Sequence, residues 1–258
     1  MPFISHLPAG DALQFIERLV TLMSRVEAKR KQVGFTEVKE VPSSTILVHC
    51  RTVVEKSGFV STGIMTHVEG DLLEIEISDS NRFVLGENVR LTVYTPAGMY
   101  MIPSTIVGKD TGSLMMINPP ENQRKFNEKR MFPRVEISKS GKLAAWKRKG
   151  AIGAFEEADQ LMAIDIKNIS LSGIGFTLPD PFRLEEHTEL KLELELGSLI
   201  ACTAKVVRME KGIGSIYYGA QYLEMEDMKI NTLRAFILRE QITALSTSKK
   251  EANKRTFK

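Results

Sequence analysis

The sequence has few of the residues from which catalytic, metal and disulfide sites are built. Its 258 residues include two cysteines, one tryptophan and four widely spaced histidines. No CxxC or HxxxH spacing occurs, which argues against a structural zinc site, and GxSxG, HExxH and P-loop strings are also missing. We therefore expect no enzyme, no metal site and no resident cofactor. Cys50 and Cys202 are expected to be buried free thiols of a reducing compartment.

Long hydrophobic stretches are absent as well. None approaches the roughly 20 apolar residues that a membrane span needs. The first residues also lack the basic and apolar regions of a secretory signal. These absences predict a cytoplasmic protein without a transmembrane segment.

A strong charge of one sign is missing too. The formal net charge is +3, and five basic residues against one acidic residue lie within the last ten positions. The remainder is therefore close to neutral, which does not indicate a basic nucleic-acid-binding surface, and no DNA partner is expected. Apolar residues make up 43% and charged residues 26% of the chain, as in proteins with a buried core.

An amphipathic stretch lies near the start of the chain, in a predicted N-terminal helical segment over 1–40. Residues 11–31 are predicted to be helical, with Asp11 as the cap and Gly34 as the stop. The apolar stripe of this helix consists of Ile16, Leu19, Val20, Met23 and Val26. We favour packing of the stripe on the chain's own domain. The other interpretation is a helix that mediates oligomer or partner contacts.

Two β-rich regions follow the helical segment. Six short strands separated by turn signals are predicted between residues 45 and 117, the first over Thr45–Val54. Six more are predicted between 135 and 223, the first over Val135–Ile137, and a helix follows them. The sequence therefore predicts a mainly β fold with two small β-barrel domains in tandem, an N-terminal helix and a C-terminal helix. The predicted boundaries are 41–118 for the first barrel, 119–129 for a linker, 130–246 for the second barrel with its helix, and 247–258 for a disordered basic tail.

Two short strings carry the chemistry of the second barrel. Residues 130–134, RMFPR, give R-x-x-x-R at the domain entrance, and residues 168–173, NISLSG, give [D/N]-x-S-x-x-G between two predicted strands. Each string alone is weak, because arginine pairs are common on surfaces and the second string is also compatible with an ordinary turn. Their conjunction in this order, with β structure between them, is much more specific.

The two arginines of the first string, Arg130 and Arg134, suit a guanine nucleotide that carries phosphates. A guanidinium group presents a planar fork of donors that matches O6 and N7 of guanine. It also pairs bidentately with phosphate and stacks on bases. Lys129 and Arg124 add positive charge nearby.

The second string supplies the complementary groups. The Asn168 carbonyl oxygen can accept from the N–H donors of guanine, although a carboxylate would accept more strongly. Ser170 offers a hydroxyl to a phosphate oxygen or a base atom. Gly173 permits a positive φ and a close backbone approach. The sequence therefore indicates a guanine nucleotide site at this turn.

These residues resemble those of the PilZ domain, a cyclic di-GMP receptor built as a six-stranded β-barrel with a C-terminal helix. Residues 218–222, YGAQY, are similar to the closing strand of that family. The upstream β unit and its linker resemble the N-terminal domain of YcgR-like flagellar-brake proteins. The resemblance covers about residues 45–245.

The resemblance implies a receptor that is not an enzyme. Cyclic di-GMP would bind at the linker and barrel, change the orientation of the two domains, and regulate flagellar motility, biofilm formation or surface behaviour through a partner such as a motor or stator protein. The implied binding residues are Arg130, Arg134, Asn168, Ser170, Gly173 and the linker residue Lys129, with Arg124, Ser172 and Gly219 as secondary candidates.

Three features depart from the usual pattern of the family. Asn168 replaces the commoner Asp, Pro133 lies inside the first string, and the interval from Arg134 to Asn168 is long. The basic stretch 142–149 around Trp146 is interpreted as an inert hairpin, with an extra contact to ligand or partner as the alternative.

Two other functions stay open. One is a PilZ-fold scaffold that no longer binds nucleotide. The other is an RNA- or DNA-binding β-barrel, which the sequence disfavours because aromatic stacking platforms interleaved with basic residues are missing.

Overall fold

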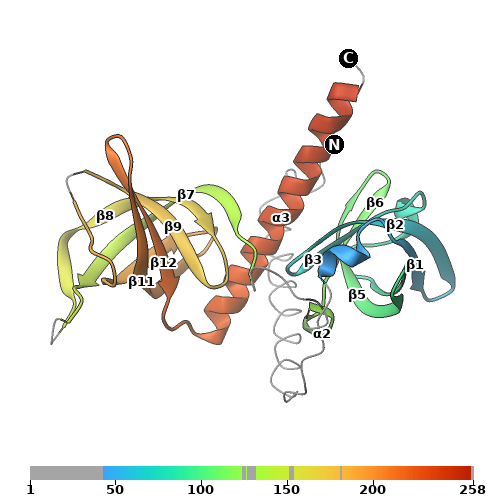
Figure 1. Cartoon of the computed structure of the whole chain (residues 1–258), viewed down its shortest axis with the longest axis horizontal. Coiled ribbons are helices and arrows are strands. Elements are labelled where there is room, and N and C mark those ends of the chain that lie inside the picture. Colours follow the sequence, from blue (N-terminus) through green and yellow to red (C-terminus); the bar gives the residue numbers. More distant parts are fainter. Residues whose placement is uncertain (1–42, 124–125, 127–131, 151–153, 181, 257–258) are drawn as a thin grey trace. The chain divides into compact units, whose positions relative to one another are not determined.

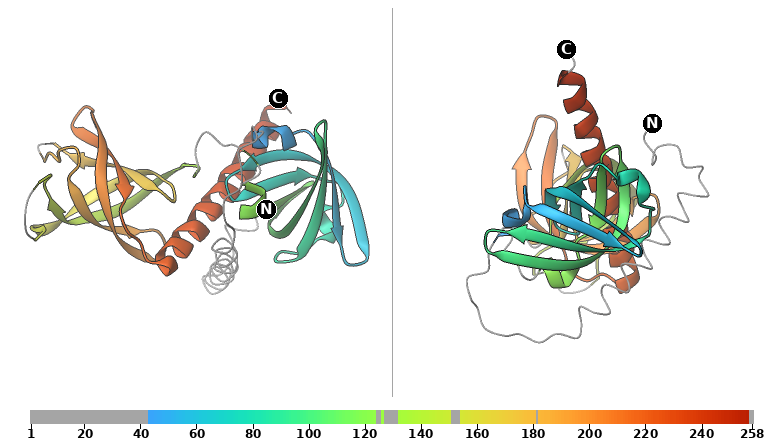
Figure 2. Two further views of the ribbon diagram at one scale, coloured as in Figure 1. Left: turned by 60° about the horizontal axis from the view of Figure 1, so that its bottom comes forward. Right: turned by 90° about the vertical axis from the view of Figure 1, so that its right-hand side faces the viewer.

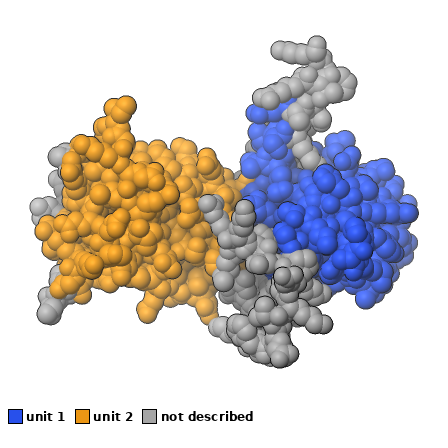
Figure 3. Space-filling view, in the orientation of Figure 1, with its two compact units in different colours: residues 1–131, 241–258 blue, residues 132–240 orange. Residues whose placement is uncertain are grey.

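The computed structural model describes residues 43–123, 126, 132–150, 154–180 and 182–256. The chain divides into two compact units, Phe132–Glu240 and Met1–Met131 with Gln241–Lys258 (Figure 3). Each unit holds a closed, six-stranded antiparallel barrel, and helix α3 follows the last strand (Figure 1). The predicted mainly β fold with two barrels and a C-terminal helix is confirmed.

The first barrel has the strand order β1-β2-β3-β6-β5-β4. Its strands are β1 (Arg51–Lys56), β2 (Phe59–Glu69), β3 (Leu72–Glu76), β4 (Asn88–Thr95), β5 (Gly98–Asp110) and β6 (Ser113–Ile117). The interior is filled by fully buried apolar side chains, among them Ile75, Leu91, Ile102 and Met116. The short helix α2 (Pro120–Gln123) follows β6.

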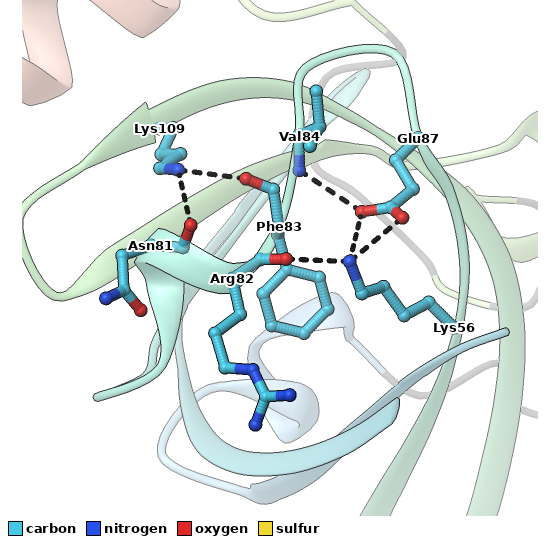
Figure 4. Close-up of polar contacts among 7 residues, drawn as sticks. All are labelled: Lys56, Asn81, Arg82, Phe83, Val84, Glu87 and Lys109. Atoms are coloured by element: carbon cyan, nitrogen blue, oxygen red, sulfur yellow. Dashed lines mark hydrogen bonds and ion pairs between the residues drawn. The ribbon is translucent and has the colours of Figure 1, made fainter. Parts of the chain in front are cut away.

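Two lysines hold the short 3-10 helix η2 (Ser80–Arg82) and its following loop in place (Figure 4). Lys56 Nζ donates to the carbonyl oxygen of Arg82 at 2.7 Å and pairs with Glu87 at 3.0 Å. Lys109 Nζ donates to the carbonyl oxygen of Phe83 at 2.9 Å. The carbonyl groups that this loop cannot pair with backbone N–H groups are thereby satisfied by charged donors.

The second barrel has the strand order β10-β11-β12-β9-β8-β7. Its strands are β7 (Val135–Lys147), β8 (Glu156–Ile169), β9 (Gly173–Pro179), β10 (Glu189–Glu195), β11 (Leu199–Lys211) and β12 (Ser215–Tyr222). Strand β10 follows the predicted alternation, with Leu192 and Leu194 buried while Lys191 and Glu195 are exposed. Figure 2 gives two further views of both barrels.

Helix α3 (Asp227–Thr256) adds apolar side chains to the core of the second barrel. Leu233, Phe236 and Ile237 are buried in the same cluster as the inward residues of the strands. The part of α3 from Gln241 onward belongs to the first unit. The sequence predicted a disordered tail over 247–258, which is wrong up to Thr256, because the helix continues through a stretch without Gly or Pro.

One predicted strand of the first barrel was placed too early. Thr45–Val54 is not one strand, because Ser44–Leu47 forms the 3-10 helix η1 and β1 begins only at Arg51. His49 has a φ of 64°, which breaks an extended chain. The apolar, β-branched composition of this stretch hid the break from sequence analysis.

The hairpin predicted around 142–149 is present as the outer part of a long β7–β8 hairpin. Trp146 Nε1 donates to Glu156 Oε2 at 3.0 Å, and the indole packs edge-on against Phe182. Strand β7 is much longer than the predicted Val135–Ile137.

Several predictions fall on residues outside the described part of the chain. These are the N-terminal helical segment and the linker residues 124–125 and 127–129. The linker's start is described: Asn122 Nδ2 donates to Asn118 Oδ1 at 2.7 Å, and Gln123 Nε2 donates to Asp71 Oδ1 at 2.9 Å. These bonds tie α2 to the first barrel.

Candidate ligand-binding site

The second string lies where β8 passes into β9 at one end of the second barrel. Asn168 is half-buried near the end of β8, Ser170 is buried in the turn, and Gly173 is the first residue of β9. Strands β8 and β9 pair directly on either side of this turn, with Ile169 opposite Ile174. A tight antiparallel turn therefore gathers the three residues.

Ser170 holds the turn together. Its backbone N–H donates to the carbonyl oxygen of Gly173 at 2.9 Å, and its Oγ donates to the same oxygen at 3.3 Å. Its Oγ also accepts from the backbone N–H of Ser172 at 3.3 Å and lies 3.2 Å from Ser172 Oγ. Ser170 is 2% exposed, so its hydroxyl shapes the turn, whereas Ser172 is exposed.

Gly173 is required for a close approach of backbone strands. A Cβ at this position would overlap the carbonyl oxygen of Ala220 on β12 and lie 3.3 Å from the Cα of Gln221. Gly173 does not adopt the positive φ that a glycine permits. The glycine lies in a regular strand and makes room for its neighbour, as small residues do where backbones approach.

Asn168 reaches across β9 to strand β12. Its Nδ2 donates to the phenol oxygen of Tyr217 at 3.0 Å. Its Oδ1 accepts no hydrogen bond from the described residues, so this oxygen keeps its capacity as an acceptor.

Arg134 lies next to this turn. Val135, the first residue of β7, pairs with Ile169, and the antiparallel register places the preceding exposed Arg134 beside Ser170. Glu136 pairs with Asn168, so Arg134, one residue before β7 begins, precedes the partner of Asn168 by two positions. The backbone of Arg134 therefore lies at the same end of the barrel as Asn168, Ser170 and Gly173. Arg130, Lys129 and Arg124 lie outside the described residues.

A row of residues continues this surface across the barrel. The register aligns Asn168 on β8, Gly175 on β9, Gly219 on β12 and Arg208 on β11. The two central positions carry no side chain of their own, but Gly175 is buried beneath the Asn168 amide and the Tyr217 hydroxyl, and Gly219 is half-buried beside Arg208. The row therefore presents an amide, a phenol and a guanidinium group.

The second barrel matches a known protein family. The model of the PilZ domain matches residues 128–239, which include both strings and all six strands of the second barrel. Residues 128–239 form a PilZ domain. The predicted resemblance of the second barrel to the PilZ domain is confirmed.

Sequence analysis missed Tyr217 and Arg208 of the PilZ domain. The Arg208 guanidinium lies 5.4 Å from the centre of the Tyr217 ring and pairs with Glu210 at 3.2 Å. Gly175, interpreted from the sequence as a turn glycine, lies inside β9 beneath the Tyr217 hydroxyl. The sequence shows Tyr217 directly before the closing-strand string, but only the strand register brings it to Asn168.

An open hollow of about 870 Å³ lies elsewhere on the PilZ domain, against β10, β11 and the start of α3. Cys202, Lys229 and Ile230 are among its lining residues, and none of the residues of the two strings is. Burial raises the pKa of the Cys202 thiol to about 12, against a smaller opposing effect of Lys229, so Cys202 is a neutral thiol at ordinary pH.

Among the described residues, His, Cys, Asp and Glu side chains do not gather in threes as a metal site would need. Within this described part of the chain, neither α2 nor α3 is long and apolar enough to cross a membrane.

Solved structures similar to this chain include three proteins of low sequence identity. The Bacillus subtilis inhibitor of motility MotI/DgrA is 16% identical with a TM-score of 0.38, over 76% of this chain and 97% of that one. YcgR from Escherichia coli in complex with c-di-GMP is 13% identical with a TM-score of 0.38, over 78% and 88%. PlzA of Borreliella burgdorferi in complex with c-di-GMP is 11% identical with a TM-score of 0.34, over 84% and 99%. No curated protein sequence matches the chain.

Proposed function

We propose that this protein is a receptor for cyclic di-GMP, and that the ligand binds at the β8–β9 turn of the PilZ domain together with the arginine string. The observation that carries the proposal is the register that sets the backbone of Arg134 at the same end of the barrel as Asn168 and Ser170. The family match supports the ligand class, because PilZ domains are effectors of cyclic di-GMP.

Each group has a chemical task in the proposed complex. Arg134, exposed at the start of β7, pairs with a phosphate or the O6/N7 edge of guanine, and Arg130 from the same string joins it. Asn168 Oδ1 accepts from the Watson–Crick N–H groups of guanine. The turn held by Ser170 presents the exposed Ser172, and Gly173 lets this turn lie against the backbone of Ala220.

The magnitude is compatible with a signalling receptor. Hydrogen bonds to charged groups contribute on the order of 1.5–3 kcal/mol each. A few of these bonds, reduced by the cost of ordering the ligand and the arginines, give roughly −8 kcal/mol, which is a micromolar Kd.

The proposed output is a change in the arrangement of the two barrel units. Lys129 and Arg130 come shortly before the boundary between the units in sequence, and Arg134 comes shortly after it. Ligand binding by these residues would therefore tie the connecting segment to the PilZ barrel. A ligand shifts such an equilibrium only by its difference in affinity between the two states. The new arrangement would be read by a protein partner that controls flagellar motility or surface behaviour in the cytoplasm.

Removing Arg134 tests the proposed site. Arg134→Ala should weaken cyclic di-GMP binding at least about a hundredfold, because a bidentate, charge-assisted contact of about 3 kcal/mol is lost. Isothermal titration calorimetry on the full chain measures the affinity. Arg51→Ala is the matched control, since Arg51 is an exposed arginine on β1 of the first barrel.

The control variant should bind like the wild type. Equal affinity of the Arg134→Ala and wild-type proteins would place the ligand elsewhere. Absence of any binding by the wild type would favour the scaffold interpretation.

A further inference from the structure

The side chains of Asn168 and Tyr217 form a pair on the outer face of the PilZ barrel. Asn168 Nδ2 donates to the Tyr217 hydroxyl at 3.0 Å across the intervening strand β9. At the point of crossing, β9 carries Gly175. A Cβ there would overlap the Tyr217 hydroxyl and lie 2.7 Å from Asn168 Oδ1 and 2.8 Å from Nδ2. The amide and the phenol therefore both lie directly over bare backbone.

The Tyr217 ring also has a cationic neighbour. Arg208 on β11 lies 5.4 Å from the ring centre, and its Nε lies 3.2 Å from Glu210 Oε1. Tyr217 is half-buried, and its hydroxyl has Asn168 as its hydrogen-bond partner among the described residues. The ring thus has a defined place beside Asn168.

We propose that Tyr217 is a positioning residue that lets an asparagine read guanine in this chain. The inference rests on the proposed function of the site. The Tyr217 hydroxyl accepts from Nδ2, so Asn168 can turn Oδ1 toward the ligand without leaving its own N–H groups unpaired.

The two ends of an amide have different hydrogen-bonding roles, since the oxygen accepts and the nitrogen donates. Guanine offers N–H donors along its Watson–Crick edge, and a carboxylate meets them with either oxygen. An amide can accept these N–H groups with Oδ1 only. If Nδ2 faced the base, an N–H donor of the amide would oppose an N–H donor of guanine. Without the phenol oxygen, the orientation that binds guanine would leave Nδ2 without a protein acceptor, which costs free energy in a half-buried place.

The same reasoning predicts that an aspartate at position 168 has no need of Tyr217. A carboxylate has no N–H group to satisfy, and the phenol O–H would compete with guanine for its oxygens. The effect of removing the hydroxyl should therefore depend on which residue is present at position 168.

A double-mutant cycle on the full chain tests the inference. Affinities for cyclic di-GMP are measured by calorimetry for the wild type, Tyr217→Phe, Asn168→Asp and the double variant. Tyr217→Phe should weaken binding about three- to tenfold in the wild-type background and change it less than about twofold in the Asn168→Asp background. Tyr94→Phe, which removes a hydroxyl from the outer face of the first barrel, is the matched control and should change neither the affinity nor the fold.

Base selectivity provides a second measurement that a merely structural role would not change. Freed from Tyr217, the amide can present its donor and acceptor to adenine, so the ratio of affinities for cyclic di-GMP over cyclic di-AMP should fall in the Tyr217→Phe protein.

The outcomes are distinguishable. Equal losses in the wild-type and Asn168→Asp backgrounds, or no loss in the wild-type background, would overturn the role of Tyr217 while leaving the receptor function intact. A wild-type chain that binds no cyclic di-GMP would overturn the proposed function, and this inference with it.

Discussion

At the scale of single residues, some side chains of the candidate site shape the turn, and others present polar atoms at its surface. Ser170 was expected to face a ligand, yet its hydroxyl is used within the turn. Asn168 Nδ2 donates to Tyr217, so Oδ1 is the amide atom that faces guanine in the proposed complex. A residue type in a string thus predicts which atoms are available, but the partners that occupy some of them come from distant strands.

Burial of one thiol in the PilZ domain gives a pH dependence of stability. Burial raises the pKa of Cys202 from 9.0 to about 12, so the folded state keeps a proton that the unfolded chain releases above about pH 9. The free energy of unfolding should therefore fall as pH rises from about 9 toward 12, by about 1 kcal/mol per pH unit from this group.

Urea unfolding at pH 8 and pH 10.5 measures this dependence. Cys202→Ala should flatten it in part, because burial also raises the pKa of Tyr222 and leaves that contribution in place. Cys50→Ala is the control and should keep the wild-type slope. An unchanged slope in the Cys202→Ala protein would show that the thiol ionises as easily in the fold as outside it.

At the scale of elements, residue composition and the alternation of apolar residues predicted the two barrels better than the boundaries of their strands. The alternation of β10 was visible because every second residue is leucine. The 3-10 helix η1 was missed because its apolar residues also suit a strand. The outer part of β7 was missed because its inward positions are Gly141, Leu143 and Ala145, of which only the leucine is large and apolar. The turn string could be predicted from its local sequence, whereas Tyr217 and Arg208 could not, since only pairing across β9, β12 and β11 brings them to the site.

Two glycines of the neighbouring strands β9 and β12 should respond differently to substitution. Gly173→Ala places a Cβ against the carbonyl oxygen of Ala220 and should lower the free energy of unfolding by about 1–3 kcal/mol, as overpacking does. Gly219→Ala meets only Arg208 side-chain atoms, at 3.5 and 3.8 Å, and should change stability by less than about 1 kcal/mol.

Urea titration followed by circular dichroism distinguishes the two variants. The account of the β9–β12 contact would be wrong if both variants were equally stable. It would also be wrong if Gly219→Ala were the more damaging change.

At the scale of the whole molecule, the chain consists of two closed barrels whose hydrogen-bonding edges are satisfied within each sheet. The candidate site therefore uses an outer surface and a strand turn, not a sheet edge. In sequence, the chain passes between the two units at Met131–Phe132, directly before Arg134, and again within α3 at Glu240–Gln241. The first of these passages lies within the arginine string, so the proposed ligand contacts would fall where the chain connects the units.

The most direct test of the central claim is an amide NMR titration of the full chain with cyclic di-GMP. The account predicts shift changes concentrated at residues 168–175 of the β8–β9 turn, at residues 217–221 of β12 and at the start of β7, with saturation at micromolar ligand. It would be contradicted by shift changes confined to strands of the first barrel, or by a spectrum that cyclic di-GMP leaves unchanged.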